Sequence, residues 1–128
     1  MQEIIKKSTG TVLTLLFIFM FSACDKSENE TFIRLSNTSS YNFGEVTVVT
    51  YGISKNFGDL EAGSSSEYIT FEHASSSVSV NLKIDETDFY YFSPSYVGDQ
   101  VFTPGNYTFK IGVEDYANGV LSFEIVRD

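Results

Sequence analysis

Residues 107–125, YTFKIGVEDYANGVLSFEI, decide the fold of this chain. Apolar side chains occupy every second position on both sides of a polar centre, as a half-buried strand requires. Asn118-Gly119 can supply the positive φ angles of a tight turn. The stretch therefore predicts a β-hairpin with one buried face; its apolar positions are Tyr107, Phe109, Ile111, Val113, Leu121, Phe123 and Ile125.

The chain before this hairpin shows the same strand character, with turn residues every 8 to 12 positions. Asp85 to Asp88 form a predicted turn, and Gly58-Asp59 with Ala62-Gly63 bracket a predicted loop. The alternation shifts by one residue at Val48-Val49, which indicates a bulge there. The further predicted strands cover residues 32–35, 45–51, 67–72, 78–84 and 89–92.

About seven short strands with no convincing helix predict a single all-β domain, a two-sheet β-sandwich of immunoglobulin-like type. The chain has 128 residues, enough for one core, and 16% of them are aromatic. A small β-barrel is the alternative fold, although lipocalin-type barrels usually need eight longer strands. The expected boundaries are residues 1–23 for a signal peptide, 24–31 for a tether and 32–128 for the sandwich.

Residues 35–48, LSNTSSYNFGEVTV, resemble the opening of small bacterial immunoglobulin-like modules. In these modules an Asn-rich turn precedes a Val-rich strand, and a Gly-centred turn, here residues 60–63, precedes the next one. The cysteine pair and core tryptophan of antibody domains are absent from this sequence.

The amino terminus has the three parts of a secretory signal. Lys6 and Lys7 form a basic start, and residues 11–21, TVLTLLFIFMF, form an apolar run. Small side chains at residues 22–24 close the run. Eleven helical residues rise only about 16 Å, which is too short for the hydrocarbon core of a bilayer. We therefore expect a signal-peptide helix that is removed.

The string Phe21-Ser22-Ala23-Cys24 resembles the lipobox of bacterial lipoproteins. The resemblance implies cleavage between Ala23 and Cys24, a diacylglyceryl group on the Cys24 thiol and an acyl chain on its new amino group. Two or three chains would hold the protein on its membrane. Cys24 is the only cysteine, so no disulfide can form within the chain. An uncleaved membrane anchor and a conventional cleaved signal are the alternatives to a lipoprotein.

Asp25-Lys26-Ser27-Glu28-Asn29-Glu30 has almost nothing to bury and is expected to be a flexible tether. It also resembles a dilute form of the acidic export signal of Bacteroidota-type surface lipoproteins, in which Asp25, Lys26, Glu28 and Glu30 would be the signal residues. Asp directly after Cys resembles instead the inner-membrane retention signal of enterobacterial lipoproteins. We expect an outer-membrane protein that faces either the cell surface or the periplasm.

The composition excludes several kinds of chemistry. A net charge of −9 without a basic cluster excludes a nucleic-acid partner. His73 is the only histidine, and no Gly-x-Ser-x-Gly turn presents a nucleophile near it. Asp85, Glu86 and Asp88 lack the order of a calcium loop, and no zinc spacing occurs. We therefore expect no enzyme activity, no cofactor and no metal.

The aromatic stretch Phe89-Tyr90-Tyr91-Phe92 is the best candidate for recognition. Alternate residues of a strand face opposite ways, so Phe89 with Tyr91 and Tyr90 with Phe92 form two sets. One set can enter the core, while the other can be exposed or covered by the following loop. Tyr90, Tyr91 and Tyr96 are the candidate binding residues, because tyrosine joins apolar area to a polar tip.

The sequence thus predicts a lipid-anchored envelope protein whose β-sandwich binds another envelope or extracellular protein, or assembles with it. A carbohydrate-binding accessory subunit of a glycan-uptake system is the alternative. A small envelope hydrolase is a third class, and it would need converging acids near His73.

Overall fold

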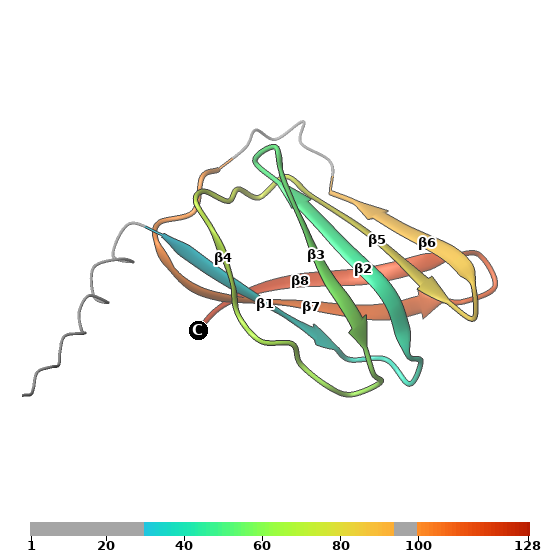
Figure 1. Ribbon diagram of the computed structural model, residues 1–128. Helices are drawn as coiled ribbons and strands as arrows, with labels where there is room; N and C mark the ends of the chain where they lie inside the picture. Colours follow the sequence, from blue (N-terminus) through green and yellow to red (C-terminus); the bar gives the residue numbers. More distant parts are fainter. Residues whose placement is uncertain (1–29, 94–99) are drawn as a thin grey trace, which may run out of the picture.

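The computed structural model, shown in Figure 1, describes residues 30–93 and 100–128. The predicted signal peptide, Cys24, Asp25, Lys26, Glu28 and Tyr96 lie outside these residues. The described part of the chain contains eight β-strands, which are β1 (Thr31–Asn37), β2 (Phe43–Thr50), β3 (Ile53–Leu60), β4 (Ile69–Phe71), β5 (Val78–Ile84), β6 (Thr87–Phe92), β7 (Gly105–Asp115) and β8 (Val120–Arg127).

The strands form two four-stranded sheets, in the orders β4-β1-β7-β8 and β3-β2-β5-β6. Neighbouring strands are antiparallel, except that β1 and β7 run parallel. The two sheets pack face to face and do not close into a barrel, so the predicted β-sandwich is confirmed. In an antibody constant domain the first strand lies beside the second. Here β1 lies between β4 and β7 instead.

Side chains from both sheets fill the space between them, and most of the long strands contribute alternate residues. In β5, for example, Val78, Val80, Leu82 and Ile84 are buried while Asn81 is exposed. Burial of one such side chain stabilises the fold by about 1.5–3 kcal/mol. The core consists of Ile33, Leu35, Phe43, Val46, Val48, Leu60, Phe71, Ala74, Val78, Val80, Leu82, Ile84, Phe89, Tyr107, Phe109, Ile111 and Leu121.

The bulge in β2 lies at its beginning, so the prediction of a bulge at Val48-Val49 is wrong. The register of β2 is regular from Thr47 to Thr50 and shifts between Phe43 and Thr47, where Glu45 has a φ of 52°. Val49 faces outward and Thr50 faces the interior. The apparent shift in the sequence arises because a threonine occupies an inward position.

The sequence does not predict strand β3, because Gly58-Asp59 is typical of one side of a loop. Gly58 has a φ of 76° and pairs with Val46 at an irregularity of the β2–β3 ladder. The Asn56 side chain accepts a hydrogen bond from the Gly58 amide at 2.7 Å. A glycine with this conformation at a bulge continues the strand rather than ending it. As an edge strand with exposed polar residues, β3 lacks a clear apolar alternation.

The other boundaries differ from the prediction by small amounts. The sandwich begins at Thr31, which is 2% exposed, and not at Phe32. Strand β4 has 3 residues, within the predicted range 67–72. The β7–β8 hairpin is confirmed, but of Asn118 and Gly119 only Gly119 has a positive φ. The Asn118 side chain instead donates a hydrogen bond to Asp115 at 2.7 Å.

Candidate functional site

The outer face of the β3-β2-β5-β6 sheet carries the exposed residues of the predicted aromatic stretch. Strand register aligns two outward rows across this sheet. Each row begins on β3, crosses β2 and β5, and ends on an aromatic residue of β6. The rows are Asn56, Thr47, Asn81 and Tyr90, and Ser54, Val49, Ser79 and Phe92.

The four aromatic residues of β6 divide between the two faces as the alternation predicts. Tyr90 and Phe92 are each 57% exposed, while Phe89 is 2% exposed. Tyr91 is half-buried and its ring stacks on Phe123 of β8, with centroids 4.7 Å apart. This burial raises the pKa of the Tyr91 phenol. Of the candidate binding residues that the structure describes, Tyr90 therefore lies on the outer face and Tyr91 on the inner face.

A polar hollow of about 210 Å³ lies beside Tyr90 on the same face. It is lined by Glu45, Thr47, Asn81, Lys83 and Asp88, with part of Leu82. Lys83 Nζ lies 2.8 Å from Asp88 Oδ1, and this hydrogen bond raises the pKa of the lysine. The Asp88 carboxylate thus forms an ion pair with Lys83. Asp85 and Glu86 form the two-residue turn before β6, with φ values of 50° and 69°.

One end of the sandwich carries a second exposed apolar group, which we call the tip and define as Tyr51, His73, Phe92 and Val101. The Tyr51 and His73 rings lie 5.3 Å apart. Tyr51 and Gly52 form the two-residue turn between β2 and β3, and Tyr51 has a φ of 54°. A bulky residue costs about 1–3 kcal/mol in this conformation, in which Asn or Gly is usual.

Hydrogen bonds hold the segments of the tip together. Thr50 Oγ1 donates to the Ser75 carbonyl and accepts from the Ser75 amide, both at 2.9 Å. Ser75 in turn pairs with Val101 in an isolated antiparallel bridge. A groove of about 460 Å³ runs between Tyr51 and Phe92 over Val49 and the serines of residues 77–79. Hydrogen bonds and a β-bridge therefore fix the segments of the tip relative to one another at the β2–β3 end of the sandwich.

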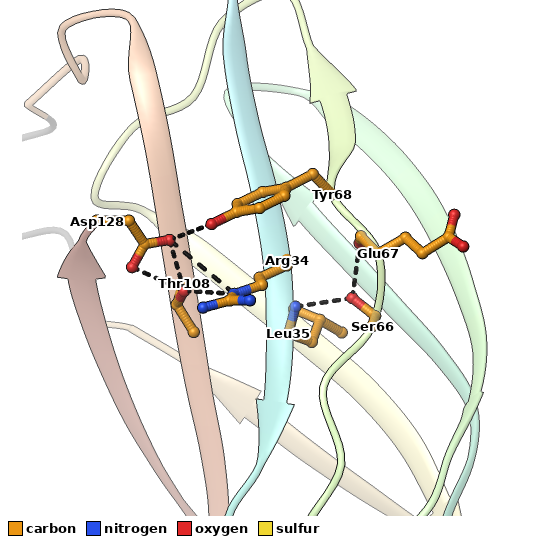
Figure 2. Close-up of polar contacts among 7 residues, drawn as sticks. All are labelled: Arg34, Leu35, Ser66, Glu67, Tyr68, Thr108 and Asp128. Carbon is orange, nitrogen blue, oxygen red and sulfur yellow. Dashed lines mark hydrogen bonds and ion pairs between the residues drawn. The ribbon is translucent and has the colours of Figure 1, made fainter.

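Figure 2 shows a polar cluster on the outer face of the other sheet. Thr108 Oγ1 accepts from Arg34 Nε at 3.0 Å and donates to the Asp128 carboxylate at 2.7 Å. Tyr68 Oη donates to the same carboxylate at 2.6 Å, and the Arg34 guanidinium lies 5.1 Å from the Tyr68 ring. The bond from Tyr68 lowers the pKa of Asp128 and raises that of Tyr68. The cluster ties the end of β8 to β1 and to the segment before β4.

His73, the residue near which a hydrolase would need converging acids, lies at the tip. His73 is exposed, and the aromatic ring beside it is that of Tyr51. Across residues 30–93 and 100–128, no group of three or more His, Cys, Asp and Glu side chains could hold a metal ion. Within the same residues, no helix is long and apolar enough to cross a membrane.

Sequence reasoning missed Tyr51 and the polar row beside Tyr90. The alternation places Tyr51 at the end of a predicted strand, although Tyr51-Gly52 before a second strand could have indicated a turn. Thr47 and Asn81 stand out in the sequence only as polar members of alternating strands. Their alignment with Tyr90 depends on strand pairing between distant segments.

No family model and no curated protein matches this chain. Among solved structures, the NMR structure of a protein from Eubacterium rectale has a similar fold, with a TM-score of 0.55 and 16% sequence identity. The match covers 79% of this chain and 92% of that one. At this identity the similarity concerns the fold alone.

Proposed function

We propose that this protein is a lipid-anchored, non-catalytic binding module of the bacterial cell envelope. Its partner is another envelope or extracellular protein, and its contact surface is the outer face of the β3-β2-β5-β6 sheet around Tyr90. The observation that carries the proposal is Tyr90 itself. Tyr90 is 57% exposed at the margin of the sheet, and the row that it ends consists otherwise of the polar residues Asn81, Thr47 and Asn56.

Strand β6 favours a protein partner over a small ligand. In the sheet that the structure describes, β6 is an edge strand that pairs only with β5. The backbone groups on its other side can therefore pair with a strand of a partner protein. Exposed tyrosines are frequent anchors of protein interfaces because they bury much apolar area at a small cost in side-chain entropy. The surface around Tyr90 combines both features.

A carbohydrate is the second candidate ligand. The polar hollow beside Tyr90 offers the Thr47 hydroxyl, the Asn81 amide and the Asp88 carboxylate, groups that can bond sugar hydroxyls. A stacking platform for a glycan would need several aromatic rings in one row. The Tyr90 row continues instead with Asn81 and Thr47. The protein partner therefore remains our main proposal.

The lipid anchor rests on the string Phe21-Ser22-Ala23-Cys24 behind an apolar run of eleven residues. We propose that the mature chain begins at Cys24 and lies on the outer membrane, with the cell-surface and periplasmic faces as alternatives. Mass spectrometry of the mature protein tests this part directly. We expect a chain that begins at Cys24 and carries acyl chains; an unmodified cysteine or another start would refute it.

Site-specific photocrosslinking in intact cells tests the contact surface. Benzoylphenylalanine in place of Tyr90 is expected to form a discrete protein adduct. The same group in place of Glu124, an exposed residue on the edge strand β8 of the other sheet, serves as the control and should form none. Adducts of equal yield at both positions, or none at Tyr90, would contradict the proposal. Retention of the protein on immobilised envelope glycans, lost in Tyr90→Ala, would favour the carbohydrate alternative.

A further inference from the structure

We propose that the tip of the sandwich docks on the lipid surface that carries the anchor, with Tyr51, Phe92 and Val101 in the interfacial region of the bilayer. The domain would then have one orientation relative to the bilayer and would not reorient freely on its tether. This inference rests on the lipid anchor of the proposed function. It concerns the end of the sandwich that adjoins the surface around Tyr90, since Phe92 is the next outward residue after Tyr90 on β6.

The path of the chain places the tip close to the membrane. Thr31, the first residue of β1, pairs with Phe71 of β4 and with Gly105 of β7. His73 follows Phe71 by two residues, so the tip lies at the end of the sandwich at which β1 begins. The six residues from Cys24 to Asn29 can span at most about 20 Å. The tip is therefore the end that an anchored domain presents to the bilayer.

The tip carries three of the four most exposed large apolar side chains of the described residues, and the fourth is Tyr90. Val101 is 54% exposed and Tyr51 is 49% exposed, and Phe92 reaches 57%. At the opposite end, Val120 is 40% exposed, and Tyr41 and Tyr116 are each 37% exposed and stack on one another, with ring centroids 4.9 Å apart. Aromatic residues are enriched where a protein meets the interface of a membrane, because one part of the ring is apolar and its tip can remain hydrated.

The conformation of Tyr51 is a further indication. A two-residue turn with positive φ at both positions favours Asn or Gly at its first position. Here a tyrosine occupies that position, and nearly half of its surface is exposed to solvent. The strained backbone projects the ring from the end of the β2–β3 hairpin. An exposed aromatic at a strained turn is typical of a site selected for contact rather than for stability.

The distribution of charge agrees with this orientation. Most carboxylates of the described chain lie at the end opposite the tip, where Lys83 is the cation beside them. A carboxylate loses much solvation near a membrane, so this end is held in water. Near the tip, Glu30 and Glu72 also carry charge, and Asp128 is engaged by Tyr68 and Thr108. The residues of the acidic end are Glu45, Asp59, Glu61, Asp85, Glu86, Asp88, Glu114 and Asp115.

Docking at the tip leaves the proposed partner surface free. Tyr90 lies one outward position before Phe92 on β6 and faces away from the sandwich. The acidic turn of Asp85 and Glu86 would be the part of this sheet farthest from the bilayer (Figure 1). A partner could therefore reach the face around Tyr90 from the side.

The absence of tryptophan from the chain provides a clean test. The lipidated protein is reconstituted in vesicles of phosphatidylethanolamine and phosphatidylglycerol, with or without lipids brominated near the top of the acyl chains. Tyr51→Trp and Phe92→Trp each place one fluorophore at the tip, and Tyr41→Trp places one at the opposite end. Interfacial segments enter to a depth of about 5–10 Å, which brings a tip fluorophore into range of these bromines.

We expect brominated lipids to quench the emission of the Tyr51→Trp and Phe92→Trp variants and to leave the emission of Tyr41→Trp unchanged. Equal quenching at both ends, or none at the tip, would overturn the inference, and so would quenching confined to Tyr41→Trp. A tip that contacts a protein instead of lipid would also remain unquenched in these vesicles. Failure of the anchor is distinguishable, because a protein without acyl chains would not float with the vesicles at all.

Discussion

The pair formed by Thr50 and Ser75 permits a sharp test of how the tip is held. Thr50 is 1% exposed and Ser75 is 0% exposed. The Thr50 hydroxyl is the partner of both the amide and the carbonyl of Ser75, at 2.9 Å each. The Thr50→Val substitution keeps the shape of the side chain and removes both hydrogen bonds. It leaves two buried backbone groups without these partners.

The loss of stability in Thr50→Val is set by the amide and the carbonyl of Ser75. Each buried backbone group that loses its partner costs about 1–3 kcal/mol, and the added methyl returns about 0.8 kcal/mol. We therefore expect Thr50→Val to lower the free energy of unfolding by about 1–5 kcal/mol, with a central value of about 3 kcal/mol. A domain of about this size has a total of roughly 5–15 kcal/mol and loses about 4–8 °C in Tm for each kcal/mol. At the central value the Tm should fall by about 12–24 °C.

Urea unfolding followed by circular dichroism measures the effect, in the mature chain with Cys24→Ser so that no lipid is present. Thr50→Ser retains the hydroxyl and should cost about 1 kcal/mol, for the lost methyl group. Thr47→Val, on the outer face of the same strand, should change stability by less than about 0.5 kcal/mol. If Thr50→Val were no more destabilising than Thr50→Ser, the bonds to Ser75 would not hold the tip as we infer.

Three further predictions concern buried or closely packed groups. Asn37 is 1% exposed and donates to the Leu60 carbonyl at 3.1 Å, so Asn37→Leu should lower the free energy of unfolding by about 2–3 kcal/mol in urea titrations. The hydrogen bond from Tyr68 lowers the pKa of Asp128, so the ionised carboxylate stabilises the folded state at neutral pH. This stabilisation is lost as the pH falls through the folded-state pKa. The stability difference between wild type and Asp128→Asn should therefore be larger at pH 7 than at pH 3, and a constant difference would contradict this reasoning. A methyl group at Gly112 would lie 2.7 Å from the Ser122 hydroxyl oxygen, so Gly112→Ala should lower the Tm and cost about 1–3 kcal/mol, which calorimetry can measure.

Much of the fold was predictable because alternation is a local property. The strands around Val80 and Phe109 bury one face, and their sequences show it directly. The prediction failed where a polar residue faces the core or a glycine continues a strand. Thr50 faces inward because Ser75, which is 25 residues away in the sequence, supplies its hydrogen-bonding partners. Gly58 belongs to β3 because its bulge pairs with Val46 on the neighbouring strand.

The candidate site was predictable only in part. The division of residues 89–92 into two faces follows from the period of a strand, but the choice of the exposed face depended on packing. Tyr91 lies inward because Phe123 of β8 receives its ring, a contact between strands of different sheets. The hollow beside Tyr90 depends on the pairing of β2, β5 and β6, which no local pattern specifies.

By itself the sequence determined the fold class, the main hairpin and the prediction of a lipid anchor at Cys24, since periodicity, turn residues and a short amino-terminal motif are read along the chain. The tertiary structure alone decided that Tyr51, Phe92 and Val101 lie at one end and that most carboxylates of the described residues lie at the other. These positions depend on which strands pair and in which register. Pairing places residues that are distant in sequence side by side, and the energy that selects it comes from the whole core.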